Sequence, residues 1–175
     1  MKQRRIVLVA LALAFGPVSA GAQAEDARPF AWDVARAVLI DPTTYAPALI
    51  VHESMRQDWK TSQALFAHGW LEQNPGYTLS GLANDVPVPY HEGTRRIRGA
   101  ALTVLGYSVV NNLGAAGLER LLITRYPKRK TLIRTLSWVE RIAFAPILTY
   151  NNSAVHFRQA AVNRRLALEH GYTNR

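Results

Sequence analysis

The sequence contains no cysteine among its 175 residues. Disulfide bonds, thiolate metal sites, a cysteine nucleophile and a lipid-modified cysteine are therefore excluded. Acidic residues are scarce in the second half, because residues 93–175 contain three acids and fourteen Lys or Arg, whereas residues 25–92 contain nine acids and four Lys or Arg. The chain must therefore be stabilised by packing or by lipid, and we expect its acidic front half to pair with its basic back half.

The first 24 residues have the pattern of an export signal. A basic start with three Lys or Arg residues precedes the apolar run 6–15, and residues 22–24 form an Ala-x-Ala cleavage site. The apolar run is short for a helix that must cross about 30 Å of hydrocarbon, which favours a cleaved signal peptide over an anchor. We therefore expect a single exported domain, residues 25–175, in the inner membrane or periplasm of a bacterium.

The exported part is predicted to be all-α, a four-helix bundle with a long kinked antiparallel C-terminal helical hairpin. Apolar residues recur at helical spacing, and turn residues separate four segments. The predicted helices cover residues 30–40, 42 to about 73, about 94 to 126 and about 131 to 170, with a loop at about 74–93. Asp41 and Thr94 are expected N-caps and Gly171 a C-cap, while Pro146 is expected to kink the last helix.

An uncharged segment suggests a membrane. Residues 99–118 contain no charged side chain, and this segment has the length of a crossing helix. It nevertheless includes the polar residues Asn111 and Asn112. An unpaired amide in lipid costs on the order of 2–7 kcal/mol. An antiparallel last helix would bring Asn111 level with Pro146, so we expect these amides to bind the carbonyls freed by the proline.

The basic turn near residues 125–134 favours a cytoplasmic turn with both ends of the exported part outside. A soluble periplasmic helical bundle is the alternative arrangement.

Residues 58–75 carry the pattern Asp-x-x-Thr-x-x-x-Leu-x-x-x-Gly-x-x-Glu-x-Asn-Pro. This pattern resembles a signature of small bacterial multi-helix membrane proteins of unknown function. The resemblance covers only these residues, implies a helical envelope protein and brings no activity with it. Taken alone, the stretch is interpreted as a helix and its terminator.

Candidate site residues form no complete catalytic or metal motif. His68 and Glu72 have the spacing of two metal ligands on a helix, but a third ligand is missing, so we expect no metal or cofactor. Glu72 is expected to pair with a basic residue, and Asp58 to be a solvated or capping acid. Five polar residues are expected to tie the helices together or to line a ligand cavity: Asn111, Asn112, Tyr150, Asn152 and His156.

The favoured function is a non-enzymatic structural or interaction component of the cell envelope. Its expected partners are membrane lipid headgroups or another envelope protein. Nucleic acid is not expected despite the pI of about 10.4, because an exported protein rarely meets it. The alternative is a soluble periplasmic metal- or ligand-dependent enzyme that uses His68, Glu72 and His156. Within the hairpin, Glu119 and Glu140 are expected to pair with Arg141 or Arg120.

Overall fold

The structure, a computed structural model, describes residues 30–172. These residues form four α-helices and no strand, which confirms the all-α prediction. The elements are α1 (Phe30–Ile40), α2 (Pro42–Phe66), the short 3-10 helix η1 (Pro75–Tyr77), α3 (Tyr90–Arg125), the 3-10 helix η2 (Pro127–Arg129) and α4 (Lys130–Glu169). The predicted signal peptide, residues 1–24, lies outside the described residues.

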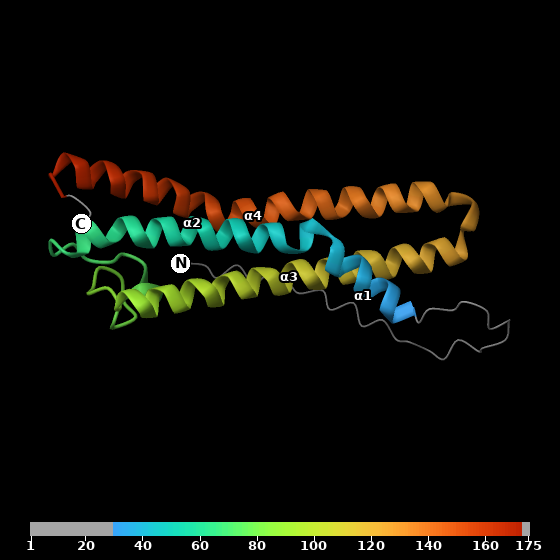
Figure 1. The fold of residues 1–175 in the computed structure, drawn as a ribbon, viewed down its shortest axis with the longest axis horizontal. Coiled ribbons are helices and arrows are strands. Elements are labelled where there is room, and N and C mark those ends of the chain that lie inside the picture. The colour runs from blue at the N-terminus through green and yellow to red at the C-terminus, as the bar shows by residue number, and fades with distance from the viewer. Residues whose placement is uncertain (1–29, 173–175) are drawn as a thin grey trace.

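The three long helices lie side by side, with α2 between α3 and α4 over much of their length (Figure 1). α2 packs extensively on both neighbours, whereas α3 and α4 contact each other less, and α1 packs on α3. The predicted hairpin of α3 and α4 is therefore present, but α2 fills most of the space between its arms. Asn112 of α3 and both His156 and Asn163 of α4 consequently bond to α2 rather than to each other's helix.

The predicted end of the second helix near residue 73 is wrong, because α2 ends at Phe66. Gly69 adopts φ +84°, and its N–H donates to the Phe66 carbonyl at 3.0 Å. The N–H of Trp70 donates to the Leu65 carbonyl at 3.2 Å, which completes a Schellman motif. Asn74, the expected terminator, instead caps η1.

Of the three predicted helix caps, two are confirmed and one is wrong. Asp41 caps α2 by accepting from the Thr43 N–H at 2.9 Å, and Gly171, at φ +69°, terminates α4. Thr94 does not cap α3, because the helix begins at Tyr90 and the Thr94 hydroxyl donates to the Tyr90 carbonyl within the first turn. The connecting loop therefore covers residues 67–89, where two isolated bridges, Glu72 with Asp85 and Thr78 with Pro87, hold it together.

The seams between the helices contain many small and polar side chains beside larger buried residues such as Val51, Trp59 and Leu65. On α4, Ala145, Ser153 and Ala160 are buried, and Ala160 has no exposed surface. Large apolar side chains are instead common on the outer faces; Leu102 and Val110 of α3 are both 66% exposed. A water-soluble bundle normally buries most of its large apolar side chains, so the number left exposed on this layer is unusual.

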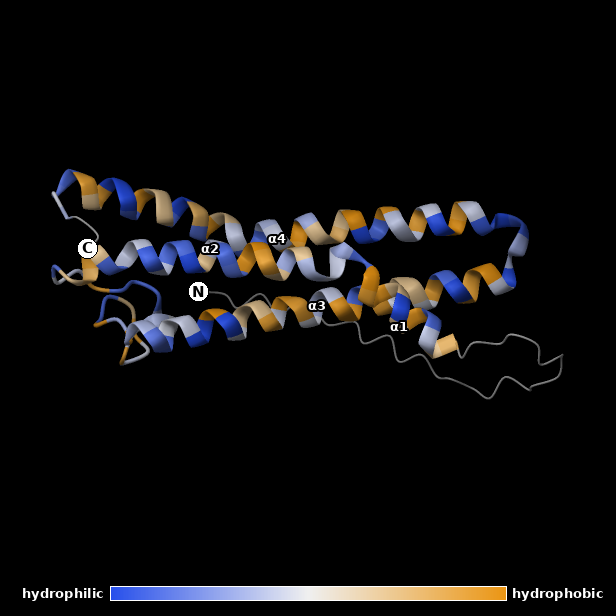
Figure 2. Ribbon diagram, in the orientation of Figure 1, coloured by the Kyte–Doolittle hydropathy of each residue, from blue (hydrophilic) through white to orange (hydrophobic). Residues whose placement is uncertain are grey.

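Only α3 is long and apolar enough to cross a membrane by itself among the described residues. Its most apolar 18-residue window has a mean hydropathy of 1.2, and 22% of that window is buried. α1 and α2 pass the same test of length and composition together, as one segment bent by 42°. Figure 2 shows how the apolar residues are distributed along the helices.

Candidate functional site

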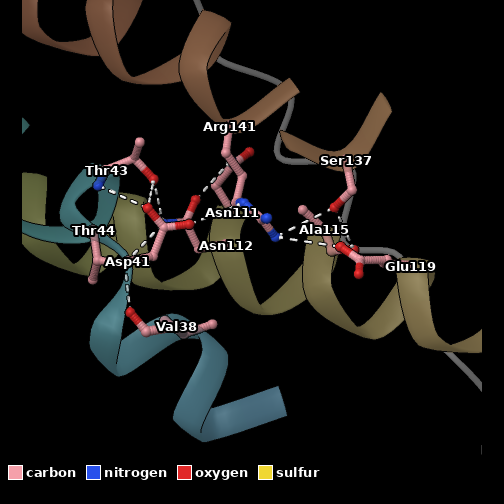
Figure 3. Close-up of polar contacts among 10 residues, drawn as sticks. All are labelled: Val38, Asp41, Thr43, Thr44, Asn111, Asn112, Ala115, Glu119, Ser137 and Arg141. Atoms are coloured by element: carbon pink, nitrogen blue, oxygen red, sulfur yellow. Dashed lines mark hydrogen bonds and ion pairs between the residues drawn. The ribbon is translucent and has the colours of Figure 1, made fainter. Parts of the chain in front are cut away.

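The first polar cluster lies where the end of α1 and the start of α2 meet α3 and α4 (Figure 3). Asn112, only 2% exposed, donates to the hydroxyls of Thr43 at 3.0 Å and Thr44 at 2.8 Å. The Thr44 hydroxyl in turn donates to the Val38 carbonyl, and Asn111 donates to the side-chain oxygen of Asn112. The prediction that these amides bind carbonyls near Pro146 is therefore wrong, because α2 supplies the partners.

Arg141 occupies the charged centre of this junction. Its Nε lies 3.0 Å from Asp41 Oδ2, and its Nη1 lies 3.8 Å from Glu119 Oε2 and 3.3 Å from the Ser137 hydroxyl (Figure 3). The Nε is buried and makes no directed hydrogen bond, so its contact with Asp41 is an ion pair without good hydrogen-bond alignment. Two acids from different helices thus surround one guanidinium.

The prediction that the acidic and basic halves pair is confirmed by contacts that join them. Arg141 pairs with Asp41 as described, and Arg120 pairs with Asp33 of α1. Glu119 meets Arg141 as expected, whereas Glu140 is exposed and takes part in none of the ion pairs found within residues 30–172. These pairs fasten α1 and the start of α2 onto the hairpin.

The five residues expected to tie the helices together or to line one cavity do not form a single group, although Asn112 and His156 each bond to α2. Asn112 contacts Thr43, whereas His156 contacts Asp58, fifteen residues further along α2, a separation of about 22 Å at 1.5 Å per residue. Tyr150 is 63% exposed, and exposed Asn152 donates to a carbonyl of its own helix. The sequence placed them on facing segments but could not show that α2 lies between those segments.

The second polar cluster lies at the other end of α2 and lines a cavity of about 570 Å³. His156 Nδ1 of α4 lies 2.8 Å from Asp58 Oδ2 of α2. Buried Asn163 donates to Asp58 Oδ1 at 3.1 Å and to the Ser62 hydroxyl at 2.8 Å, and Gln159 donates to Asn163 at 2.9 Å. The expectation of a solvated or capping Asp58 is therefore wrong, since two groups of α4 hold its carboxylate.

Aromatic rings form another wall of this cavity. Trp59, Phe66 and Tyr77 all line it, and the centroid of the Trp59 ring lies 5.7 Å from that of Phe66 and 5.4 Å from that of Tyr77. The Trp59 indole N–H donates to the Tyr90 carbonyl at 3.1 Å, which fixes the ring. A Cβ at Gly93 would lie 2.3 Å from this ring, so glycine is required for the ring to lie against α3.

Glu72 reaches the cavity from the loop and carries a perturbed carboxyl group. Burial, and to a lesser degree the nearby negative charge of Asp58, raise the pKa of Glu72, although the Asn74 N–H, at 2.7 Å, opposes the change. Burial and the charge of Asp58 also raise the pKa of Tyr77 to about 12. Glu72 takes part in none of the ion pairs within residues 30–172, so its expected basic partner is not observed.

His68 does not join Glu72 as a metal ligand pair. Because α2 ends at Phe66, the helical spacing that would align the two side chains is lost. The His68 ring stacks on Tyr172, with 3.7 Å between centroids, and does not line the cavity. Among residues 30–172, no group of three or more His, Asp or Glu side chains is arranged to hold a metal ion.

The chemistry available in the cavity is binding and proton exchange rather than nucleophilic attack. The Ser62 hydroxyl donates to the backbone carbonyl of Asp58 and accepts from Asn163, so His156 does not activate it. His156 and Glu72 are candidates on sequence grounds, but the network that Asp58 and Asn163 form with His156 is not predicted by any motif. Their separation of about a hundred positions along the chain left no local signal. No family model, curated protein or solved structure matches the chain.

Proposed function

We propose that this chain is an exported cell-envelope component whose three long helices lie in or against a membrane and act through lipid and helix contacts. The observation that carries the proposal is the large apolar surface on the outside of the helix layer. Val110 and Leu102 of α3, Leu49 of α2 and Ile147 of α4 are each more than half exposed. Lipid is the occupant favoured for these faces because they are uncharged and flanked by basic residues.

Uncharged segments in α2, α3 and α4 support the proposal that all three helices contact lipid in one band across the layer. Residues 99–118 of α3, 42–52 of α2 and 142–157 of α4 contain no Asp, Glu, Lys or Arg. In α3 this length is about 30 Å, which matches a hydrocarbon core. The shorter lengths in α2 and α4 favour an arrangement in which the Glu53–Arg56 pair of α2 reaches the headgroup region at one edge.

Small side chains in the seams also favour a membrane setting. Helices in lipid associate through close packing and interhelical hydrogen bonds, because burying apolar surface gains little there. Ala145, Ser153 and Ala160 of α4 and Ser54 of α2 are buried and small, and Asn163 bonds across the same seam. A soluble bundle of this length would ordinarily place larger apolar residues at such positions.

Basic residues at both ends of α3 suit anionic headgroups as the charged partner. Arg95, Arg96 and Arg98 precede the uncharged segment, and a second group follows near the turn, at residues 120–134. α1 begins toward that turn, whereas α4 ends at the opposite end of the layer (Figure 1). If α2, α3 and α4 all cross the membrane, Phe30 and Glu169 would therefore lie on opposite sides of it. This arrangement differs from the predicted topology, in which both ends lie outside.

Alkaline carbonate extraction of membranes from cells that express the full chain tests the proposal. We expect the chain to stay in the membrane pellet. Val110→Lys should shift it toward the soluble fraction, because a lysine near the centre of a crossing helix costs about 2.5–3.5 kcal/mol. Leu79→Lys, at an exposed loop position, is the matched control and should have no effect. Release of the unmodified chain by carbonate would overturn the integral version of the proposal.

A further inference from the structure

The cavity at the C-terminal end of α2 is a built site that lipid contact does not explain. Its volume of about 570 Å³ lies within the range of small-molecule pockets. It is formed by the second half of α2, by α4 and by loop residues 70–77, at the end of the layer away from the α3–α4 turn. These segments lie beyond the uncharged residues 42–52 of α2, so the cavity faces the aqueous or headgroup side.

The charge of the lining is unbalanced. Asp58 and Glu72 both line the cavity, and of the described residues around it none is Lys or Arg. His156 is the one lining side chain able to carry positive charge, and it bonds to Asp58. The Arg96 guanidinium, whose charge acts on Tyr77, is engaged by Glu92 and by the Gly76 carbonyl. Burial is the main cause of the raised pKa of Glu72, and the nearby charge of Asp58 adds to it.

The aromatic wall completes the chemistry of the lining. Trp59 is buried and held by its bond to Tyr90, Phe66 and Tyr77 flank it, and Trp70 stands at the exposed rim. Ring faces attract cations within about 6 Å, and tryptophan attracts them best. Carboxylates beside fixed aromatic faces are the combination that suits an alkylammonium group: the carboxylate neutralises its charge and the rings cover its methyl or methylene groups.

We propose that this cavity binds a small organic cation, an amine or quaternary ammonium, between the Glu72 and Asp58 carboxylates and the aromatic rings. The Asn163, Gln159 and Ser62 network holds Asp58 in place for this contact. A metal ion is the less suitable cation, because the two carboxylates and one histidine do not form a ligand group. Binding does not depend on whether the outer helix faces lie in a membrane.

Titration calorimetry and tryptophan fluorescence of the purified full chain test this site. The probes are butylammonium and tetramethylammonium chloride, with 1-butanol and butyrate as neutral and anionic counterparts and MgCl2 as the metal probe, all at matched ionic strength. We expect saturable binding of the two cations in the millimolar range or tighter, and at least about ten-fold weaker binding of the other three.

Three variants make the test specific. Glu72→Gln should weaken butylammonium binding about ten-fold, equivalent to about 1.4 kcal/mol. Trp70→Leu should weaken tetramethylammonium binding by about three-fold or more, as expected for one lost ring face. Glu53→Gln makes the same charge change on the exposed side of α2, outside the cavity, and should leave binding unchanged. Glu72 lies in the loop and Trp70 at the exposed rim, so both variants should keep the helical circular dichroism spectrum.

Equal binding of butylammonium and 1-butanol would overturn the proposal, as would Glu72→Gln binding like the unmodified chain. Failure of every cation to bind in the millimolar range, or preferential binding of Mg²⁺, would overturn it as well. A chain that carbonate releases from membranes yet binds butylammonium through Glu72 would contradict the membrane proposal alone.

Discussion

The two ends of α2 are both tied to α3 or α4 by polar side chains, but the charges are paired at one end, here called the closed end, and unpaired at the other, the open end. At the start of α2, Arg141 lies between Asp41 and Glu119, and Arg134 also reaches Glu119, so two cations face two acids. At the far end, Asp58 and Glu72 face a cavity in which His156 is the one cationic candidate among the lining residues described. Arg141 and Glu119 also border a cavity, of about 330 Å³, but acids and bases line it together. Paired charges are typical of a structural lock, whereas unpaired charge around a larger cavity is typical of a binding site.

The difference also bears on stability. Buried ion pairs contribute little net stability when intact, but removing one partner leaves the other charge desolvated. The junction should therefore tolerate substitutions poorly. The cavity at the other end contains the carboxyl group of Glu72, whose charged form is disfavoured by burial. Replacing Glu72 by a neutral residue should therefore not destabilise the protein. Removing the charge of Arg141 at one end and that of Glu72 at the other should consequently change the free energy of unfolding in opposite directions.

The largest effect is expected for Arg141→Ala at the closed end. The variant leaves Asp41 and Glu119 without their shared cation in a partly exposed but mostly covered site and should lower the free energy of unfolding by up to about 3–5 kcal/mol. Urea denaturation followed by circular dichroism measures the change. Glu140→Ala, at the exposed neighbouring position, is the control and should change it by less than about 0.5 kcal/mol. Similar changes in the free energy of unfolding for the two variants would contradict the interpretation of this junction as a structural lock.

Asn112→Ala tests the neutral part of the same junction. It removes the hydrogen bonds to Thr43 and Thr44 at a site that is 2% exposed, and it leaves a small void. The expected loss is about 2 kcal/mol, from one or two hydrogen bonds and lost packing. Asn152→Ala, an exposed amide of α4, should be close to neutral in the same denaturation experiment.

Gly93→Ala tests how firmly the open end holds its aromatic wall. The new methyl group would lie 2.3 Å from the Trp59 ring, so either the ring or α3 must move. The expected cost is about 1–2 kcal/mol, with a shift in the tryptophan emission spectrum. Gly99→Ala is the matched control, because nothing lies within 4 Å of the methyl position there. An unchanged spectrum and unchanged stability would show that the wall is not fixed by this contact.

The smallest effect, and the one opposite in sign, is expected for Glu72→Gln. The pKa of this acid is raised in the folded protein above its ordinary value of 4.5, so folded chains bind more protons than unfolded chains between the two values. The free energy of unfolding therefore falls as pH rises through that window. At pH 7 Glu72→Gln should be slightly more stable than the unmodified chain, and at pH 3 the gain should vanish. A loss of stability at pH 7 would contradict the interpretation of Glu72 as a carboxylate that burial disfavours in its charged form.

Much of the fold followed from local sequence signals. Asp41-Pro42 marked the start of α2, Tyr126-Pro127 the end of α3, and Gly171 the end of α4, because caps, prolines and glycines act on their own backbone neighbours. The early end of α2 was also local, since Gly69 carries the positive φ of a Schellman motif. It was masked by the continuing apolar residues Trp70 and Leu71, which suggested one more helical turn.

The candidate site was beyond reach of the sequence for a different reason. Asp58 and Asn163 are about a hundred residues apart, and their meeting depends on the register of α2 against α4. The short turn between α3 and α4 predicts that these two helices pair directly. Because α2 lies between them, Asn112 instead bonds to Thr43 and Thr44, and His156 bonds to Asp58. Register between helices distant in sequence has no local signature.

Single cysteines test the membrane account most directly, because the native chain contains none. Val110→Cys places a thiol on the outer face of α3 and Leu79→Cys places one in the loop, and both parent side chains are more than 60% exposed. A charged maleimide is added to open membrane fragments and, separately, to detergent-solubilised, unfolded chain. We expect Leu79→Cys to react in both samples and Val110→Cys to react only after unfolding. Reaction of Val110→Cys in membranes as fast as Leu79→Cys would contradict lipid contact at the centre of α3.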